Sequence, residues 1–463
     1  MSFNRENIIR TSDFLLYRNF HNGDILEDML KITESLAMLL DKECEQTGLE
    51  GIEISNPATD RNEVDITRIR ALATSCFNRL IELSASHGFS GNLWHTYLTY
   101  LCANHENAYS TACEIRGYVD GSINFVAEHD FELLRQLFSL DLPELDKALN
   151  LNIFRLINNY IGTDEGKIFN TRVRDRICDL AKLLSCAEDS TEFKGMITDF
   201  YKEFGVGKFG LHKAFRIDHD SDGSVLIKPI TNIKHVYLED LVGYEIAKQK
   251  LIDNTEAFIE GRPSNNCLLF GDAGTGKSSS IKGILNRYYD KGLRIIEVYK
   301  HQFIDLNDVI AQIKSRNYKF ILYMDDLSFE DFEVEYKYLK AVIEGGLEKK
   351  PSNVLIYATS NRRHIVKESI NDRADIREDM HTGDTVQEKL SLSARFGVTI
   401  YFGSPSKKEF NNIVKVLADR HKVSMSEEEL LLEANKWELS HGGLSGRTAQ
   451  NFINYLLGKS EEQ

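Results

Sequence analysis

The sequence has few of the features that mark secreted, membrane-spanning or proline-rich proteins. It holds only 7 cysteines and 6 prolines among 463 residues, and no two cysteines form a C-x-x-C pair. Such scattered cysteines are typical of reduced thiols, so we exclude a disulfide scaffold and expect a cytoplasmic protein. No apolar run approaches the roughly 18 residues of a membrane span, and the N-terminal residues show no signal-peptide pattern.

An excess of basic residues is also missing. The formal net charge is −15, from 56 Lys and Arg against 71 Asp and Glu. Residues 1–230 carry 24 basic and 36 acidic residues, a balance of −12, whereas residues 231–463 carry 32 and 35, a balance of −3. A protein that binds a phosphate backbone presents a basic face, so the charge does not support nucleic acid as a partner, although it leaves that partner open.

The spacing of apolar residues changes near residue 205. Before it, segments such as ILEDMLKITESLAMLL place apolar residues three and four positions apart, which predicts a mainly α-helical N-terminal domain over residues 1–205, a candidate for partner binding. The polar turn DHDSDGS and the apolar run VLIKPI then predict a β-hairpin linker over residues 206–238. The turn resembles the start of a calcium loop, but Pro229 stands where that loop needs a carboxylate, so we expect no calcium site.

From about residue 240 short apolar runs alternate with helical segments. This alternation predicts an α/β domain over residues 239–403, with a five-stranded, mostly parallel sheet and helices on both faces. Residues 404–463 lack strand patterns and predict a small C-terminal helical subdomain, called the lid below. The five expected strands are NCLLF (266–270), LRIIEVY (293–299), KFILYM (319–324), VLIYAT (354–359) and VTIYF (398–402).

The most specific motif in the chain is GDAGTGKS, which matches G-x-x-x-x-G-K-[ST] in full. It follows an apolar strand and opens a helix, as a P-loop does, so its backbone N–H groups and the helix N-terminus are expected to hold the phosphates of ATP. Lys277 should reach the β- and γ-phosphates, and the Ser278 hydroxyl should ligate Mg²⁺. The predicted nucleotide-binding residues here are Gly271, Asp272, Ala273, Gly274, Thr275, Gly276, Lys277, Ser278 and Ser279.

An acidic pair follows the third expected strand. KFILYM runs into Asp325, expected to hold Mg²⁺ with Ser278, and Asp326, expected to polarise the attacking water. In most P-loop proteins that hydrolyse ATP, which this pattern resembles, the second acid is glutamate. Aspartate is one methylene shorter, and Glu330 is a weaker candidate for the same role.

The segment LEDLVGYEIAKQKLIDNTEAFIEGRPSNNCLLFGDAGTGKSS resembles the lead-in and first motif of AAA+ ATPases. The resemblance implies that Val242, Gly243 and Tyr244 wrap the adenine. In VLIYATSNRR it places Asn361 at the position called sensor 1, where it would hydrogen-bond the attacking water and the γ-phosphate.

Two arginines complete the resemblance. Arg395, in EKLSLSARFGVTIYF, stands where AAA+ proteins carry the arginine finger, and Arg447, in LSGRTAQNFINYLL, stands where they carry sensor 2. More narrowly, MDDLSFE, ATSNRRH, SARFG and SGRTA together resemble one bacterial AAA-type family, labelled domain of unknown function 815. That resemblance covers roughly residues 205–458.

The resemblance implies an ATPase that binds ATP and Mg²⁺, forms a homo-oligomer and remodels an unknown macromolecule. Lys277, Asp326 and Asn361 would serve catalysis, and Arg395 would act in a neighbouring subunit. Two alternatives stay open: a slowly hydrolysing switch, loader or adaptor that presents its N-terminal domain to a protein partner, and, less favoured, a P-loop kinase. Arginines of the polar loop 362–390, among them Arg362, Arg363, Arg373 and Arg377, are candidates for partner contact.

Overall fold

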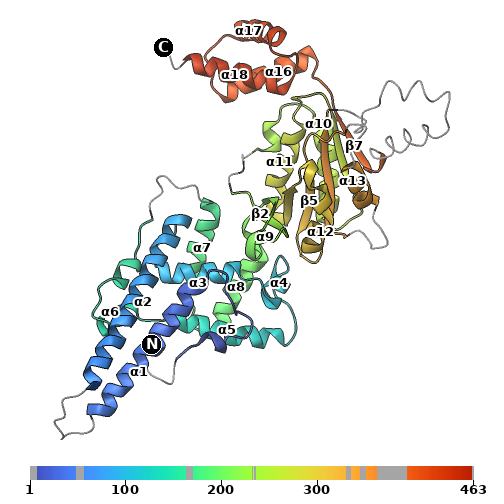
Figure 1. The fold of residues 1–463 in the computed structure, drawn as a ribbon. Coiled ribbons are helices and arrows are strands. Elements are labelled where there is room, and N and C mark those ends of the chain that lie inside the picture. Colours follow the sequence, from blue (N-terminus) through green and yellow to red (C-terminus); the bar gives the residue numbers. More distant parts are fainter. Residues whose placement is uncertain are drawn as a thin grey trace. The chain divides into compact units, whose positions relative to one another are not determined.

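The computed structural model describes residues 8–47, 57–162, 170–231, 233, 236–329, 335–344, 351–361 and 394–460. The chain divides into two units, Met1–His212 and Lys213–Gln463, shown in Figure 1. No helix within the described ranges is long and apolar enough to cross a membrane.

The N-terminal unit is built from helices, so the prediction of a mainly helical region before the α/β core is confirmed. Asparagine or aspartate caps several of these helices, for example Asn92 before α3 and Asp189 before α8, and their side chains accept a hydrogen bond from the first turn. The helices are α1 (Asp24–Thr47), α2 (Pro57–His87), α3 (Leu93–Asn104), α4 (Ala108–Cys113), α5 (Ile123–Phe138), α6 (Leu142–Ala148), α7 (Thr171–Leu184), α8 (Ser190–Phe204) and α9 (Gly207–Leu211).

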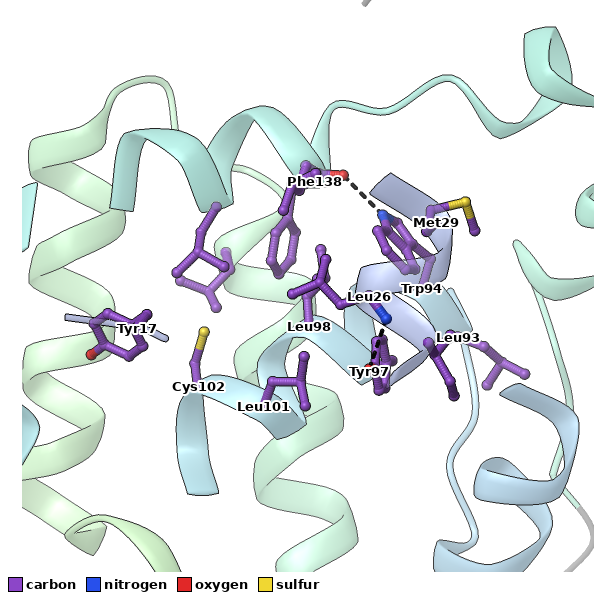
Figure 2. Packing of buried hydrophobic residues seen from close by; sticks show 14 of the residues in the cluster. Tyr17, Leu26, Met29, Leu93, Trp94, Tyr97, Leu98, Leu101, Cys102 and Phe138 are labelled. Atoms are coloured by element: carbon purple, nitrogen blue, oxygen red, sulfur yellow. Dashed lines mark hydrogen bonds between the residues drawn. The ribbon is translucent and has the colours of Figure 1, made fainter. Parts of the chain in front are cut away.

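Helix α3 lies in the core of this unit, and two of its aromatic side chains fix its place. The Trp94 indole N–H donates to the Leu137 carbonyl at 2.9 Å, and the Tyr97 hydroxyl accepts from the Leu26 N–H at 3.0 Å (Figure 2). Both rings are buried. Because a buried donor or acceptor without a partner is costly, these bonds hold α3 against α1 and α5 in one arrangement.

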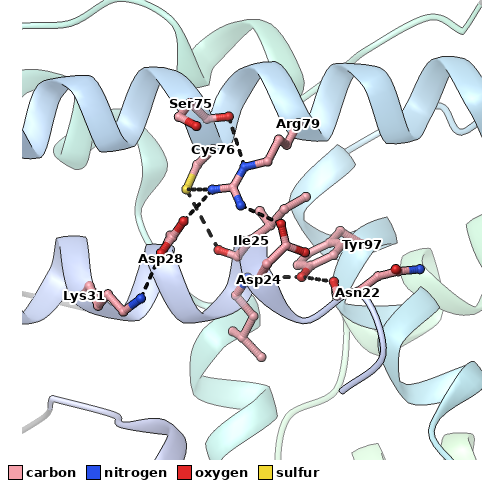
Figure 3. A network of polar contacts seen from close by, with 10 residues as sticks. Asn22, Asp24, Ile25, Asp28, Lys31, Ser75, Cys76, Arg79 and Tyr97 are labelled. Atoms are coloured by element: carbon pink, nitrogen blue, oxygen red, sulfur yellow. Dashed lines mark hydrogen bonds and ion pairs between the residues drawn. The ribbon is translucent and has the colours of Figure 1, made fainter. Parts of the chain in front are cut away.

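Helices α1 and α2 are joined by an ion-pair network around Arg79 (Figure 3). Its guanidinium lies 2.5 Å from a carboxylate oxygen of Asp24 and 2.6 Å from one of Asp28, both on α1. Cys76 lies 3.4 Å from the same guanidinium, yet burial raises the pKa of its thiol to about 11. The network therefore serves helix packing, and Cys76 remains a protonated core residue.

The C-terminal unit contains one mixed sheet in the order β2-β1-β4-β5-β6-β3-β7. All neighbouring pairs are parallel except β1 and β2. The fold class predicted from the sequence, an α/β core with a mostly parallel sheet, is confirmed. The strands are β1 (Ala214–His219), β2 (Val225–Pro229), β3 (Cys267–Gly271), β4 (Leu293–Glu297), β5 (Lys319–Met324), β6 (Val354–Ser360) and β7 (Val398–Phe402).

The prediction of five strands is wrong, because the sheet formed by the described residues has seven. The two additional strands, β1 and β2, form the expected hairpin, and this hairpin belongs to the sheet: Ala214 of β1 pairs in parallel with Ile295 of β4. The pairing satisfies the edge of β4, whose backbone groups would otherwise lack partners, and it buries Phe215 and Ile217.

Helices cover the sheet and form the lid. Helices α10 and α11 pack on one face through a shared apolar cluster, and α12 and α13 lie on the other side of the sheet in Figure 1. The lid has a small core of its own around Phe410 and Phe452. The helices are α10 (Glu245–Ile259), α11 (Lys277–Tyr288), α12 (Leu306–Ile313), α13 (Glu335–Glu344), α16 (Lys407–Arg420), α17 (Glu427–Ser440) and α18 (Gly446–Ser460).

Candidate functional site

A cavity of about 710 Å³ opens at the carboxyl ends of β3, β5 and β6. Because parallel strands end at the same edge of a sheet, this topology brings together residues that are far apart in the sequence. The lid contributes to the wall through α16 and α18. The predicted site residues that line the cavity are Val242, Tyr244, Ala273, Gly274, Thr275, Gly276, Lys277, Ser278, Ser279, Asp325, Asp326, Asn361 and Arg447.

Other predicted residues lie outside the cavity wall. Gly271 and Asp272 belong to the P-loop and accept hydrogen bonds from Lys277 without lining the cavity, and Gly243 lies between two lining residues. Arg395 does not line the cavity; its guanidinium pairs with Glu344 at the end of α13. The structure does not describe Glu330 or the loop 362–390 with its four arginines.

Two glycines show why the P-loop needs this residue type. At Gly271, φ is +136°, and a Cβ atom would lie 2.0 Å from the Phe402 carbonyl oxygen on β7. At Gly276, which precedes the first turn of α11, φ is +93°. Neither conformation suits a residue with a side chain, so both glycines are needed for the loop to turn between β3 and α11.

The Lys277 ammonium is bound by groups at the rim of the cavity. It donates to the carbonyl oxygens of Gly271 at 2.8 Å and Asp272 at 2.6 Å, and to Oδ1 of Asn361 at 3.0 Å. Burial lowers the pKa of Lys277, and the nearby carboxylates of Asp272, Asp326 and Asp325 oppose that effect. These partners are neutral acceptors that anionic oxygens can replace, because a bond to an ionised acceptor is stronger.

Asp325 is held by two hydroxyl groups. Its Oδ1 accepts from Ser278 Oγ at 2.7 Å and from Thr359 Oγ1 at 2.6 Å. Burial alone would raise the pKa of Asp325, but these hydrogen bonds outweigh it, and the pKa lies below its usual value. The carboxylate is therefore ionised beside the P-loop hydroxyl.

Asp326 has an unusual backbone that its neighbours hold in place. Its φ is +50°, in the left-handed region, which aspartate tolerates better than most residues. Its N–H donates to Thr359 Oγ1 at 2.9 Å, and its Oδ1 accepts from Nδ2 of Asn361 at 2.8 Å. Asn361 thus connects the acid to Lys277, with its amide oxygen toward the cation and its amide nitrogen toward the anion.

These ligands fit a magnesium ion. Mg²⁺ prefers oxygen ligands, and the Ser278 hydroxyl and the Asp325 carboxylate supply them side by side at the cavity wall. The nearby Tyr323 hydroxyl is buried and makes no hydrogen bond to any residue that the structure describes. An unpaired polar atom next to an ionised carboxylate is the kind of exception that a missing ion or ligand explains.

The opposite end of the cavity is apolar. Leu241, Val242, Ile413 and Leu417 line it, so the lid and the segment before α10 enclose it from two sides. Tyr244 has a left-handed backbone, with φ +59°, and its ring lies 5.4 Å from that of Phe402. This part of the cavity suits the flat apolar surface of a nucleobase.

The lid contacts the rest of the site through two groups of hydrogen bonds. The N–H of Arg447, in the first turn of α18, donates to the carbonyl oxygen of Gly274 at 3.1 Å. Arg420, at the end of α16, donates to the carbonyl oxygens of Asp240 at 2.7 Å and Glu239 at 2.9 Å. A change in lid position would therefore act directly on the P-loop.

Several residues of the site did not emerge from the sequence reasoning. Thr359 could have been found, because β-strand alternation puts it on the same face as Asn361, two residues later. Ser404 binds the Asp272 carboxylate through its N–H at 2.7 Å and its hydroxyl at 2.8 Å, and Lys248 binds the Leu241 carbonyl at 2.7 Å. Neither residue belongs to a motif, so local sequence gave no signal.

Comparison with known proteins identifies the family. The model of the family described as "Protein of unknown function (DUF815)" matches residues 210–460, more than half of the chain. The chain belongs to this family. The resemblance seen in the sequence is thereby confirmed.

Solved structures of the Thermotoga maritima RuvB Holliday junction branch migration motor are also similar. One has 15% sequence identity and a TM-score of 0.31, and the match covers 48% of this chain and 72% of that chain. A mutant of the same protein has 14% identity and a TM-score of 0.30, over 47% of this chain and 71% of that chain. Likeness at this level carries no argument about function. No curated protein matches the chain.

Proposed function

We propose that this protein is an ATPase of the AAA+ type, which binds ATP with Mg²⁺ in the 710 Å³ cavity and hydrolyses it. One observation carries the proposal. A continuous set of hydrogen bonds joins the P-loop to the ends of two neighbouring strands: Ser278 to Asp325, Asp325 to Thr359, Thr359 to Asp326, Asp326 to Asn361 and Asn361 to Lys277. A phosphate-binding cation, a metal-binding acid and a polar residue that can hold water are thus parts of one unit.

The proposed chemistry follows from these groups. Lys277 would exchange its carbonyl partners for phosphate oxygens, and Ser278 and Asp325 would hold Mg²⁺, which neutralises the charge that develops during phosphoryl transfer. Asp326 would polarise the attacking water, and the Asn361 amide would orient it. The apolar end of the cavity would receive adenine between Tyr244, Val242 and the lid.

Arg447 and Arg395 would couple ATP hydrolysis to the remodelling of a macromolecule. Arg447 lines the cavity from the lid, so it can contact the nucleotide in its own subunit. Arg395 does not reach that cavity, so we propose that it acts in a neighbouring subunit of a homo-oligomer, after release from Glu344. The work driven in this way would be remodelling of a macromolecule, with the acidic N-terminal region as the surface that a protein partner binds.

Steady-state ATP hydrolysis by the full chain tests the proposal. We expect Mg²⁺-dependent activity in the wild type and a loss of roughly 100-fold or more in Lys277→Ala, because that change removes the phosphate-binding cation. Arg395→Ala should lose activity only at protein concentrations where oligomers form. Arg262→Ala is a matched control, because Arg262 is an exposed arginine of the same unit that also pairs with a glutamate. Wild-type activity no higher than that of Lys277→Ala would refute the proposal.

A second function, an ATP switch that hydrolyses slowly, is favoured by one feature of Asp326. Its carboxylate is short and is already engaged by Asn361, so it is poorly placed to pull a proton from water. Such a switch would change its oligomeric state or partner binding when ATP replaces ADP. We would abandon it if light scattering showed the same mass with ATP, with ADP and without nucleotide, and if partner binding were equally unchanged.

A further inference from the structure

Two tyrosines lie opposite each other in the core of the sheet, and their hydroxyl groups differ. Tyr323 on β5 and Tyr357 on β6 are register partners, with exposed fractions of 3% and 0%. The Tyr357 hydroxyl lies 3.0 Å from Asn254 Nδ2 and 3.0 Å from Thr255 Oγ1. The Tyr323 hydroxyl makes no hydrogen bond of ordinary geometry to a residue that the structure describes.

The unpaired hydroxyl lies close to the metal-binding acid. Tyr323 precedes Asp325 by two residues, so in an extended backbone the two side chains project to the same face of the sheet. Burial, followed by the charge of Asp325, raises the pKa of Tyr323, and the Ser278, Asp325 and Thr359 side chains all lie near enough to its hydroxyl to influence that pKa. A buried hydroxyl without a partner is destabilising, so a core phenylalanine would suit this arrangement better. Folding alone therefore does not explain the hydroxyl.

One oxygen of the neighbouring acceptor, the Asp325 carboxylate, is already occupied by two other donors. Oδ1 of Asp325 accepts two short hydrogen bonds, from Ser278 and from Thr359, and a carboxylate oxygen has about two lone-pair sites. A cation bound between Ser278 and Asp325 would compete for the same lone pairs and draw the two groups into a new arrangement. The Tyr323 hydroxyl lies near Asp325 and could then donate to it, without breaking a hydrogen bond to any residue that the structure describes.

We propose that Tyr323 is a positioning residue for the metal-bound state, in which its hydroxyl donates to Asp325 and holds this carboxylate against the cation. This inference rests on the proposed function, since it assumes that Ser278 and Asp325 bind Mg²⁺ together with nucleotide. It gives a role to Tyr323, a residue that the sequence placed only in a strand and not among the candidate site residues. Tyr323 touches neither the nucleotide nor the reacting atoms, so it is not a catalytic residue.

The test compares Tyr323→Phe with Tyr357→Phe in the full chain. Thermal unfolding is followed with EDTA, with the non-hydrolysable analogue adenylyl imidodiphosphate plus EDTA, and with the analogue at increasing Mg²⁺. For Tyr323→Phe we expect a melting temperature equal to or above that of the wild type in EDTA. We also expect roughly tenfold more Mg²⁺ at half-saturation, because a tenfold change corresponds to about 1.4 kcal/mol, the size of one hydrogen bond to a charged group.

Tyr357→Phe should give the opposite pattern. It loses two buried hydrogen bonds, so its melting temperature in EDTA should fall, while its Mg²⁺ half-saturation should match the wild type. If Tyr323→Phe lowered the melting temperature in EDTA and left the Mg²⁺ midpoint unchanged, Tyr323 would be an ordinary core residue and the inference would be overturned. A wild type that responds neither to the analogue nor to Mg²⁺ would overturn the proposed function along with it.

Discussion

One set of buried polar side chains in each unit of this chain shows a different kind of pairing. In the N-terminal unit the fully buried Asp130 carboxylate accepts hydrogen bonds from the backbone N–H groups of Leu15, Leu16 and Tyr17, between 2.7 and 3.1 Å. In the C-terminal unit Lys277 donates to Asn361, and Asp325 accepts from Ser278, at the wall of an open cavity. The first arrangement fixes a fold, whereas the second leaves partners that a ligand can replace.

Tyr17 and Tyr201 in the N-terminal unit and Tyr323 in the C-terminal unit show a similar contrast. The hydroxyl of Tyr17 lies 2.9 Å from that of Tyr201, which donates to the Cys102 carbonyl at 2.8 Å, so this buried chain ends on backbone. Among the residues that the structure describes, the Tyr323 hydroxyl in the other unit has no such partner. The paired hydroxyl groups of Tyr17 and Tyr201 stabilise the fold, whereas the Tyr323 hydroxyl beside Asp325 is free to bond when a ligand rearranges the site.

Of the variants that test this contrast, Asp130→Ala should have the largest effect, a loss of stability. The change leaves three backbone N–H groups without their buried acceptor, and we expect a loss of about 3–4 kcal/mol in the free energy of unfolding of the N-terminal unit. Urea unfolding measures it, and the exposed Asp120→Ala is the control. Nucleotide binding should not change. A variant that kept wild-type stability would show that the carboxylate is not needed for folding and would remove the contrast.

A smaller effect is expected from Asp326→Glu, which lengthens the acid to the residue common in hydrolysing relatives. The left-handed backbone at this position, φ +50°, penalises glutamate by about 1 kcal/mol and shifts its carboxylate away from Asn361. We therefore expect kcat to fall roughly tenfold instead of rising. Asp326→Asn is the control, since it keeps a residue that tolerates this backbone and loses the base. A higher kcat in Asp326→Glu would mean that side-chain length limits hydrolysis and would favour the switch.

The sequence predicted those parts of the site that depend on motif order and strand ends. Ser278, Asp325 and Asn361 follow or open recognisable elements, and a parallel sheet must bring such positions to one edge. It did not predict that β1 would pair with β4, because a hairpin pattern says nothing of the strand beside it. It also did not predict the ion pair of Arg395 with Glu344, which depends on how α13 packs.

Main-chain hydrogen bonds and backbone turns in the site could not be predicted from the sequence, for a physical reason. The bond from the Arg447 N–H to the Gly274 carbonyl involves main-chain atoms, which every residue has, so side-chain identity cannot signal it. The motif gave Arg447 a place on the lid, but only the packing of α18 on the P-loop shows that its backbone is part of the site. For the same reason the left-handed turn at Asp326 explains the aspartate only after the structure is known.

The smallest expected effect concerns pH and the Asp325 carboxylate. Its pKa is lower in the folded protein than the ordinary value of 3.8, so the folded state favours the ionised form. The resulting stabilisation is fully present above pH 3.8 and is lost as the pH falls through the folded-state pKa. Asp325→Asn, which keeps the shape but cannot ionise, should therefore be less stable than the wild type at pH 6, and the difference should shrink toward pH 3. Thermal unfolding of the two proteins across this range measures it. A difference that stayed constant with pH would show that Ser278 and Thr359 bind Asp325 without regard to its charge, and the acid would then resemble the structural Asp130 more than a metal ligand.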